Sequence, residues 1–152
     1  MDDVIIVGAG IGGLTLGLAL QCCGIRCRIF ESAAEIRPIG VGINLLPHAT
    51  KELAALGLEQ SLASVAIETR DATFFNRFGQ LIYQEPLGRA AGYEHPQFSI
   101  HRGDLQIVLL AAFRARASRM AWPAPLEPRG TIGCAASPSN VTRPKLQRGS
   151  GS

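Results

Sequence analysis

Three glycines near the start of the chain have the spacing of a nucleotide-binding loop. Gly8, Gly10 and Gly13 directly follow the apolar residues 4–7. The first glycine allows a tight turn out of a strand, the second lets a pyrophosphate approach the backbone, and the third lets a helix pack closely on the strand. No Lys or Arg lies in the loop, so N–H groups at a helix N-terminus must supply the phosphate contacts. The candidate loop residues are Gly8, Ala9, Gly10, Ile11, Gly12 and Gly13.

An acidic residue follows the loop at the distance expected of a ribose-binding carboxylate. Glu31 ends residues 25–31, which read as a second short strand, about 20 residues after the glycines. Between them, residues 14–20 have the composition of an apolar helix that Gly24 can end. A carboxylate at this place accepts hydrogen bonds from ribose hydroxyls and repels a 2′-phosphate, which argues against NADP in this pocket. The pattern predicts a βαβ unit that binds an ADP moiety; the structural alternative is a glycine-rich turn with an unrelated surface Glu31.

The rest of the chain up to about residue 115 has the patterns of ordinary secondary structure. Pro47 suits the first turn of a helix, and Gly79 suits the turn of a β-hairpin. Apolar spacing and turn residues give the expected elements. They are a helix over 48–56, a shorter helix over 59–63, a hairpin over 70–85, a loop over 86–96, and residues 98–106, which lead from an extended segment into an apolar helix.

Three separate segments resemble the class A flavoprotein monooxygenases, the p-hydroxybenzoate and salicylate hydroxylase group, and within it most closely the phenazine monooxygenases. These segments are residues 8–13, residues 31–32 with 35–44, and residues 99–106. The resemblance implies an α/β fold, a Rossmann-like βαβ FAD-binding domain of the glutathione-reductase type. This domain is expected to be incomplete, because the resemblance covers only about the first quarter to third of a family member. The hairpin would begin the sheet that covers the substrate, over residues 70–100.

The resemblance also implies a set of cofactor-binding residues. By it, the glycine loop holds the FAD pyrophosphate, and Glu31 binds the adenosine ribose. Arg37 and the backbone of residues 40–43 would line the flavin side. Arg102 and Gln106 would contact the phosphate and ribityl region, a task that suits a guanidinium because its donors match phosphate oxygens. Outside the loop, the set is Glu31, Ser32, Arg37, Gly40, Val41, Gly42, Ile43, Arg102 and Gln106.

Members of this family use NADH or NADPH to reduce the flavin, form a flavin hydroperoxide with O2, and insert one oxygen atom into a small aromatic substrate. Because the cofactor carries this chemistry, no catalytic residue and no metal site is assigned. Aromatic side chains of the hairpin would face the substrate or pack their own sheet; they are Phe74, Phe75, Phe78 and Tyr83. Two alternatives stay open: a truncated FAD- or ADP-binding module without turnover, and an NAD-dependent Rossmann dehydrogenase.

The cysteines and the hydropathy pattern bear on the compartment. The cysteines lack the spacing of a zinc or redox pair, so we expect buried, inert thiols in a reducing cytoplasmic protein. They are Cys22, Cys23, Cys27 and Cys134. No targeting segment and no membrane association is expected, because no apolar stretch has the length that a bilayer requires.

The composition changes abruptly after about Ala117. Residues 114–152 hold seven Arg and Lys residues against one acid, Glu127. Prolines and small polar residues replace the apolar periodicity, so residues 116–152 are expected to form an unstructured tail after a domain of residues 1–115. An out-of-frame read of a GC-rich gene is the preferred explanation. A nucleic-acid-binding arm is disfavoured, because the basic residues are dispersed and not interleaved with aromatic residues.

The length of the chain bears on its association. At 152 residues it is expected to lack later strands of the parallel sheet. A parallel sheet needs both faces covered, so an incomplete one leaves an edge and an apolar face exposed. Self-association through the uncovered sheet is therefore expected.

Overall fold

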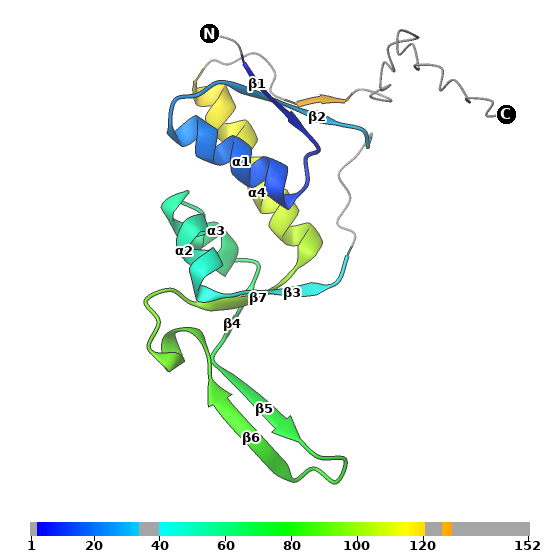
Figure 1. Cartoon of the computed structure of the whole chain (residues 1–152), viewed down its shortest axis with the longest axis vertical. Helices are drawn as coiled ribbons and strands as arrows, with labels where there is room; N and C mark the ends of the chain where they lie inside the picture. Colours follow the sequence, from blue (N-terminus) through cyan, green and yellow to red (C-terminus); the bar gives the residue numbers. More distant parts are fainter. Residues whose placement is uncertain (1–2, 34–39, 121–125, 129–152) are drawn as a thin grey trace, which may run out of the picture.

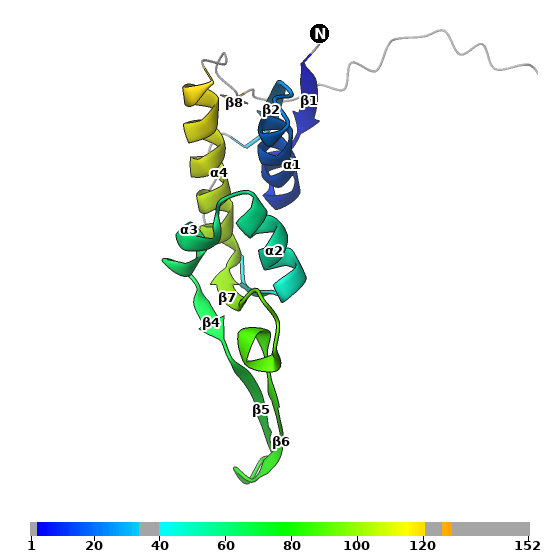
Figure 2. The same ribbon diagram turned by 90° about the vertical axis from the view of Figure 1, so that its left-hand side faces the viewer.

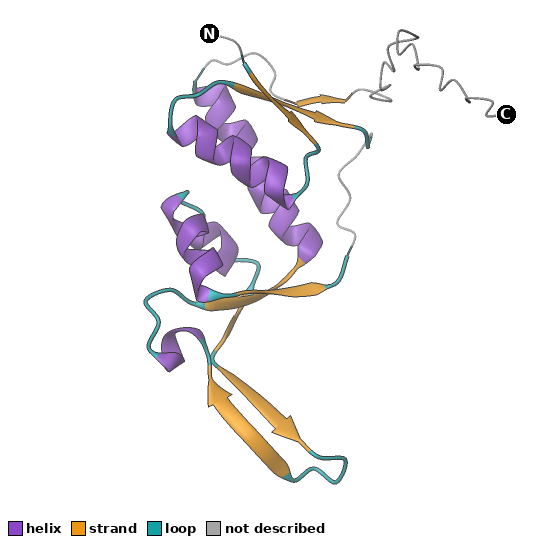
Figure 3. Ribbon diagram, in the orientation of Figure 1, coloured by secondary structure: helices purple, strands orange, loops and turns teal. Residues whose placement is uncertain are grey.

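The computed structural model describes residues 3–33, 40–120 and 126–128 (Figure 1). Helices and strands alternate along the first part, and a long hairpin projects from the rest of the molecule (Figure 3). In chain order the elements are β1 Val4–Val7, α1 Ile11–Cys22, β2 Cys27–Glu31, β3 Gly42–Leu45, α2 Pro47–Ala55, α3 Glu59–Ala63, β4 Ile67–Thr69, β5 Asp71–Phe75, β6 Leu81–Pro86, the 3-10 helix η1 Gly88–Ala91, β7 Gln97–His101, α4 Arg102–Arg119 and β8 Leu126–Pro128.

The predicted βαβ unit is present at the N-terminus. β1 and β2 pair in parallel, from Val4 opposite Cys27 to Val7 opposite Phe30. α1 connects them and covers one face, where Ile6 of β1 is buried. The sheet order is β1-β2-β8, so β1 lies at an edge in the described part of the chain. This confirms the strand–helix–strand arrangement expected from the glycine loop.

The core lies where α1 packs on α4, two helices far apart in the sequence (Figure 2). A Cβ atom added to Gly17 of α1 would lie 2.7 Å from a ring carbon of Phe113, so this glycine lets the two helices approach. Buried apolar residues of α4 recur at every fourth position, which places them on one helix face. They are Leu105, Leu109, Phe113 and Ala117.

A second, antiparallel sheet supports the other end of α4. β7 is its central strand and pairs with β3 on one side and β4 on the other. α2 and α3 pack beside this sheet and α4, which agrees with the helices predicted over 48–56 and 59–63. β5 and β6 form the predicted hairpin as a separate two-stranded sheet. No helix in the described part of the chain has both the length and the apolar character needed to cross a bilayer.

The predicted tail begins inside a helix. α4 continues through Arg119, because Ala117 extends the buried stripe of Leu109 and Phe113 by one more turn. Its arginines occupy the remaining faces, so the basic composition concealed the helical pattern. The short strand β8 also falls in this segment and pairs in parallel with β2, with Leu126 opposite Ile29. Residues 121–125 and 129–152 of the predicted tail lie outside the described residues.

Two further expectations need correction. The predicted loop over residues 86–96 contains η1, which begins at Gly88 where the backbone lies against Gln97. Cys22 and Cys23 are exposed rather than buried, because they lie at the end of α1, where the helix leaves the core. Cys27 is buried as predicted, and this burial raises the pKa of its thiol, with a smaller contribution from Asp3. Cys134 lies outside the described residues.

Candidate functional site

The glycine loop joins β1 to α1 and is open on its outer side. Gly8 has a φ of +97°, a conformation that favours glycine, and its N–H donates to the Phe30 carbonyl at 2.8 Å. Cβ atoms added to Gly8, Gly10 or Gly12 would meet no atom within 4 Å. Gly10 caps α1 without a side-chain hydrogen bond and no acidic residue lies in the first turn, so N–H groups there remain available to an anion.

Two side chains from distant elements hold the centre of this loop. The N–H of Ala9 donates to Glu31 Oε2 at 2.7 Å, and the carbonyl of Ala9 accepts from Gln106 Nε2 at 2.8 Å. Glu31 ends β2 and Gln106 lies in the second turn of α4. Ala9 itself is fully buried. Side chains from β2 and α4 therefore fix the loop from both sides.

Glu31 is held as a carboxylate. Its Oε1 accepts from the N–H of Ala33 at 2.8 Å and from the Ser32 hydroxyl at 3.3 Å. The N–H groups of Ala33 and Ala9 hold the pKa of this carboxyl below its usual range. At neutral pH the end of β2 thus presents a negative charge beside the glycine loop. The remaining lone pairs suit hydroxyl donors and oppose a phosphate.

The backbone of residues 40–43 is hydrogen-bonded to residues at the start of α4. The N–H of Arg102 donates to the Val41 carbonyl at 3.1 Å, and β3 pairs with β7 from Gly42 opposite His101. His101 Nδ1 accepts from the N–H of Gly103 at 3.2 Å, so its other nitrogen carries the proton and donates to the Gly40 carbonyl at 3.1 Å. His101 thereby caps α4 and holds the preceding segment.

Arg102 provides a positive charge at the start of α4. Its side chain is exposed and forms no ion pair with any other residue that the structure describes. It stands at the N-terminus of α4, and the N-termini of α1 and α4 lie on the same side of the molecule (Figure 2). The aliphatic stem of Arg102 lies close to Gly40: a Cβ atom added to Gly40 would lie 3.1 Å from Cβ of Arg102. Arg37 of the predicted set lies outside the described residues.

The structure thus brings most of the predicted site residues together, and it places one further residue, His101, among them. Glu31, Ser32 and Gln106 contact the loop or one another, while Val41 and Arg102 meet through the backbone. His101 was not among the predicted site residues. Its position between an extended run and a helix, where a side-chain acceptor caps a helix, is the sequence signal that identifies it.

The chain matches the family model described as "FAD binding domain" over residues 1–123. It is 52% identical over 115 residues to the phenazine 1,6-dicarboxylic acid hydroxylase PhzS of Lysobacter antibioticus, which covers 75% of this chain and 28% of that protein. It is 38% identical over 121 residues to the 3-amino-4-hydroxybenzoate 2-monooxygenase of Streptomyces cremeus, which covers 75% of this chain and 30% of that enzyme.

Solved structures agree on the fold. The R204Q variant of Klebsiella pneumoniae HpxO, complexed with FAD, superposes with a TM-score of 0.60 at 28% identity, over 73% of this chain and 29% of that one. The p-nitrophenol 4-monooxygenase PnpA of Pseudomonas putida gives a TM-score of 0.70 at 21% identity, over 85% of this chain and 31% of that one. The chain spans less than a third of the length of these relatives. From the family match and the shared α/β fold, this chain belongs to the FAD binding domain family.

Proposed function

We propose that this chain carries the ADP-binding half of an FAD site in a flavin-dependent monooxygenase that hydroxylates a small aromatic substrate. The observation that carries this proposal is the open glycine loop whose Ala9 is held by Glu31 and Gln106. The loop fits the group: its N–H groups suit a pyrophosphate, and a Cβ at Gly10 would occupy otherwise empty space. FAD, when bound, supplies the redox chemistry with O2, and the reductant would be NADH or NADPH.

The proposed roles follow from what each group can do. N–H groups of residues 10–13 would bind the pyrophosphate, and the Glu31 carboxylate would accept from ribose hydroxyls with Ser32 beside it. Arg102 would neutralise phosphate charge, while Gln106 and His101 would position the loop and the segment Gly40–Ile43. Arg37 is assigned to the flavin side by family resemblance alone. The relatives named for phenazine and hydroxybenzoate chemistry favour an aromatic substrate for the whole protein.

The hairpin would begin the part of the protein that covers the substrate, within residues 70–100. Phe74 and Tyr83 stack across it with ring centroids 6.3 Å apart, and each is 53% exposed. Phe75 and Phe78 are exposed as well, so none of these aromatic residues is packed on a core within the described residues. This supports a role at a surface that another part of the protein, or a ligand, covers.

Glu31→Gln is expected to weaken FAD binding by roughly 10- to 100-fold, because a charge-assisted hydrogen bond contributes about 1.5–3 kcal/mol. The amide also places a donor against the N–H of Ala9 or Ala33. Titration of FAD by quenching of flavin fluorescence measures the change. Glu52→Gln, an exposed carboxyl on α2 in the described structure, is the matched control and should bind like the wild type. Equal affinity of the Glu31 variant and the wild type would contradict the assigned ribose contact.

Self-association through β1 is the second part of the proposal. Ile5 and Val7 are 66% and 71% exposed on an edge strand of the described sheet, a combination that favours pairing with another strand. Ile5→Lys is therefore expected to lower the sedimentation coefficient toward that of a monomer. Ile82→Lys on the hairpin, 67% exposed in the wild type, is the control and should not. A wild-type chain that sediments as a monomer throughout would rule the association out.

A further inference from the structure

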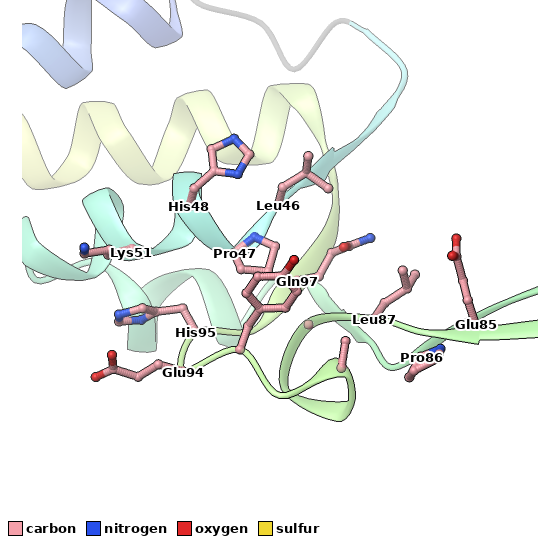
Figure 4. Close-up of a pocket in the computed structure, with 13 residues that line it drawn as sticks. Leu46, Pro47, His48, Lys51, Glu85, Pro86, Leu87, Glu94, His95 and Gln97 are labelled. Carbon is pink, nitrogen blue, oxygen red and sulfur yellow. The ribbon is translucent and has the colours of Figure 1, made fainter.

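A cavity of about 520 Å³ lies beside the N-terminus of α2 and the start of β7 (Figure 4). It is open to solvent on one side and is lined by the start of α2, the end of β6, η1 and the segment that leads into β7. Its size falls in the range of small-molecule sites. The walls are mainly apolar and include one aromatic ring; they are formed by Leu46, Pro47, Pro86, Leu87, Ala91 and Tyr93.

Gln97 is the buried residue among the polar residues that line this cavity, whereas His48, Lys51, Glu85, Glu94 and His95 are more exposed. It is only 6% exposed, and its backbone is held in β7 opposite Thr69. Its carboxamide has no hydrogen-bond partner among the described residues. Figure 4 shows its amide end directed toward Leu46 and Leu87. The carboxamide nitrogen and oxygen are not fully buried, so a ligand in the cavity can reach both and form hydrogen bonds with them.

The chemistry of this amide limits what it can recognise. A glutamine side chain offers an acceptor and a donor side by side, so its complement carries a donor and an acceptor at the same spacing. A primary carboxamide or a lactam has this edge, whereas a carboxylate lacks the donor. The rim has no single sign of charge, since Lys51 stands with Glu85 and Glu94. His95 of the rim lies 4.0 Å from Glu59. The rim therefore gives an anion little advantage.

We propose that this cavity binds a small planar ring bearing a carboxamide or lactam. Gln97 pairs with the donor–acceptor edge, and the ring lies against Leu46, Leu87 and Tyr93. Two sources share this chemistry: a free aromatic amide, and the nicotinamide group of a reduced dinucleotide. Binding of a free aromatic amide would be independent of the proposed function. Binding of the nicotinamide group rests on the proposed function, because the reduced dinucleotide would be the reductant of the monooxygenase.

The proposal is tested by comparing the binding of nicotinamide and nicotinate. The two compounds share a ring and a size but differ in the group that Gln97 would bind. Binding to the full chain without FAD is followed by ligand-observed NMR. Nicotinamide is expected to bind several-fold more tightly than nicotinate. Gln97→Leu should weaken nicotinamide binding at least about fivefold, because leucine cannot form the hydrogen bonds of the carboxamide. Gln60→Leu, an exposed glutamine on α3, is the matched control.

A second variant tests the proposal if Gln97→Leu fails to fold. The Tyr93 side chain is 60% exposed, so Tyr93→Ala should keep the wild-type melting temperature and still weaken nicotinamide. Competition by NADH would assign the site to the dinucleotide; nicotinamide binding without such competition would assign it to a free amide. Equal binding of nicotinamide and nicotinate, no binding of either, or full binding by both variants would overturn the proposal. None of these readouts requires FAD, so failure here is distinct from failure of the FAD site.

Discussion

Replacing Gly10 by alanine is expected to leave the chain folded and to weaken FAD binding by at least about tenfold, an effect of 1.4 kcal/mol or more. Gly10 has a φ of −71° and a ψ of 179°, a conformation that alanine adopts freely. A Cβ at this position would meet no atom within 4 Å. The change in the free energy of unfolding should therefore stay within about 1 kcal/mol, because loss of glycine flexibility offsets a poorer N-cap.

The loss is confined to binding because the methyl group enters the space that the pyrophosphate needs. A phosphate contacting the N–H groups of residues 10–13 must come within hydrogen-bond distance of this backbone. Fluorescence titration with FAD gives the affinity, and urea unfolding of the same sample gives the stability. An alanine variant that binds FAD as tightly as the wild type would show that the pyrophosphate does not lie over Gly10.

Gly13→Ala, unlike Gly10→Ala, is expected to act on stability and to unfold the N-terminal βαβ unit. A Cβ there would lie 2.0 Å from the Gly8 carbonyl oxygen and 3.3 Å from Cγ2 of Ile6. Both neighbours belong to β1 or the turn that follows it, so α1 must move away from the sheet. The overlap is with backbone, which no rotamer change relieves. We expect the free energy of unfolding to fall by about 3 kcal/mol or more.

Urea unfolding followed by circular dichroism measures this loss, and the Gly10→Ala chain is its comparator. FAD affinity should decline together with the folded population in Gly13→Ala, whereas in Gly10→Ala it declines in a fully folded chain. A Gly13→Ala midpoint equal to that of the wild type would mean that α1 is not packed on β1 as the structure has it. The two variants thus separate the loop's role in folding from its role in binding.

The elements that local patterns specify were predictable from the sequence. The glycine loop, the helix after Pro47 and the hairpin with Gly79 depend on residues close together in the chain, and their positions agree with the structure. The predicted domain ends at residue 115, inside α4. The end of this helix is hard to recognise in the sequence because its apolar residues recur only at every fourth position, among arginines. Reading the i, i+4 spacing of Phe113 and Ala117 would have extended it.

Contacts between distant residues were not predictable in the same way. The Gln106 side chain reaches Ala9 across 97 positions, and β7 comes to lie between β3 and β4 only because the intervening chain folds back. Sequence reasoning assigned Gln106 to the cofactor, and the structure gives it a bond to the loop carbonyl. The partnerless amide of Gln97 depends on the approach of η1 and α2, which no local pattern specifies.

The central claim is that the glycine loop and Glu31 form a site for the ADP half of FAD, and competition with the two halves of the cofactor tests it most directly. FAD is titrated into the wild-type chain by calorimetry, alone and then in the presence of saturating ADP or FMN. We predict saturable binding with one FAD per chain, displaced by ADP and little affected by FMN. Absence of binding by a folded chain, or displacement by FMN and not by ADP, would contradict the account.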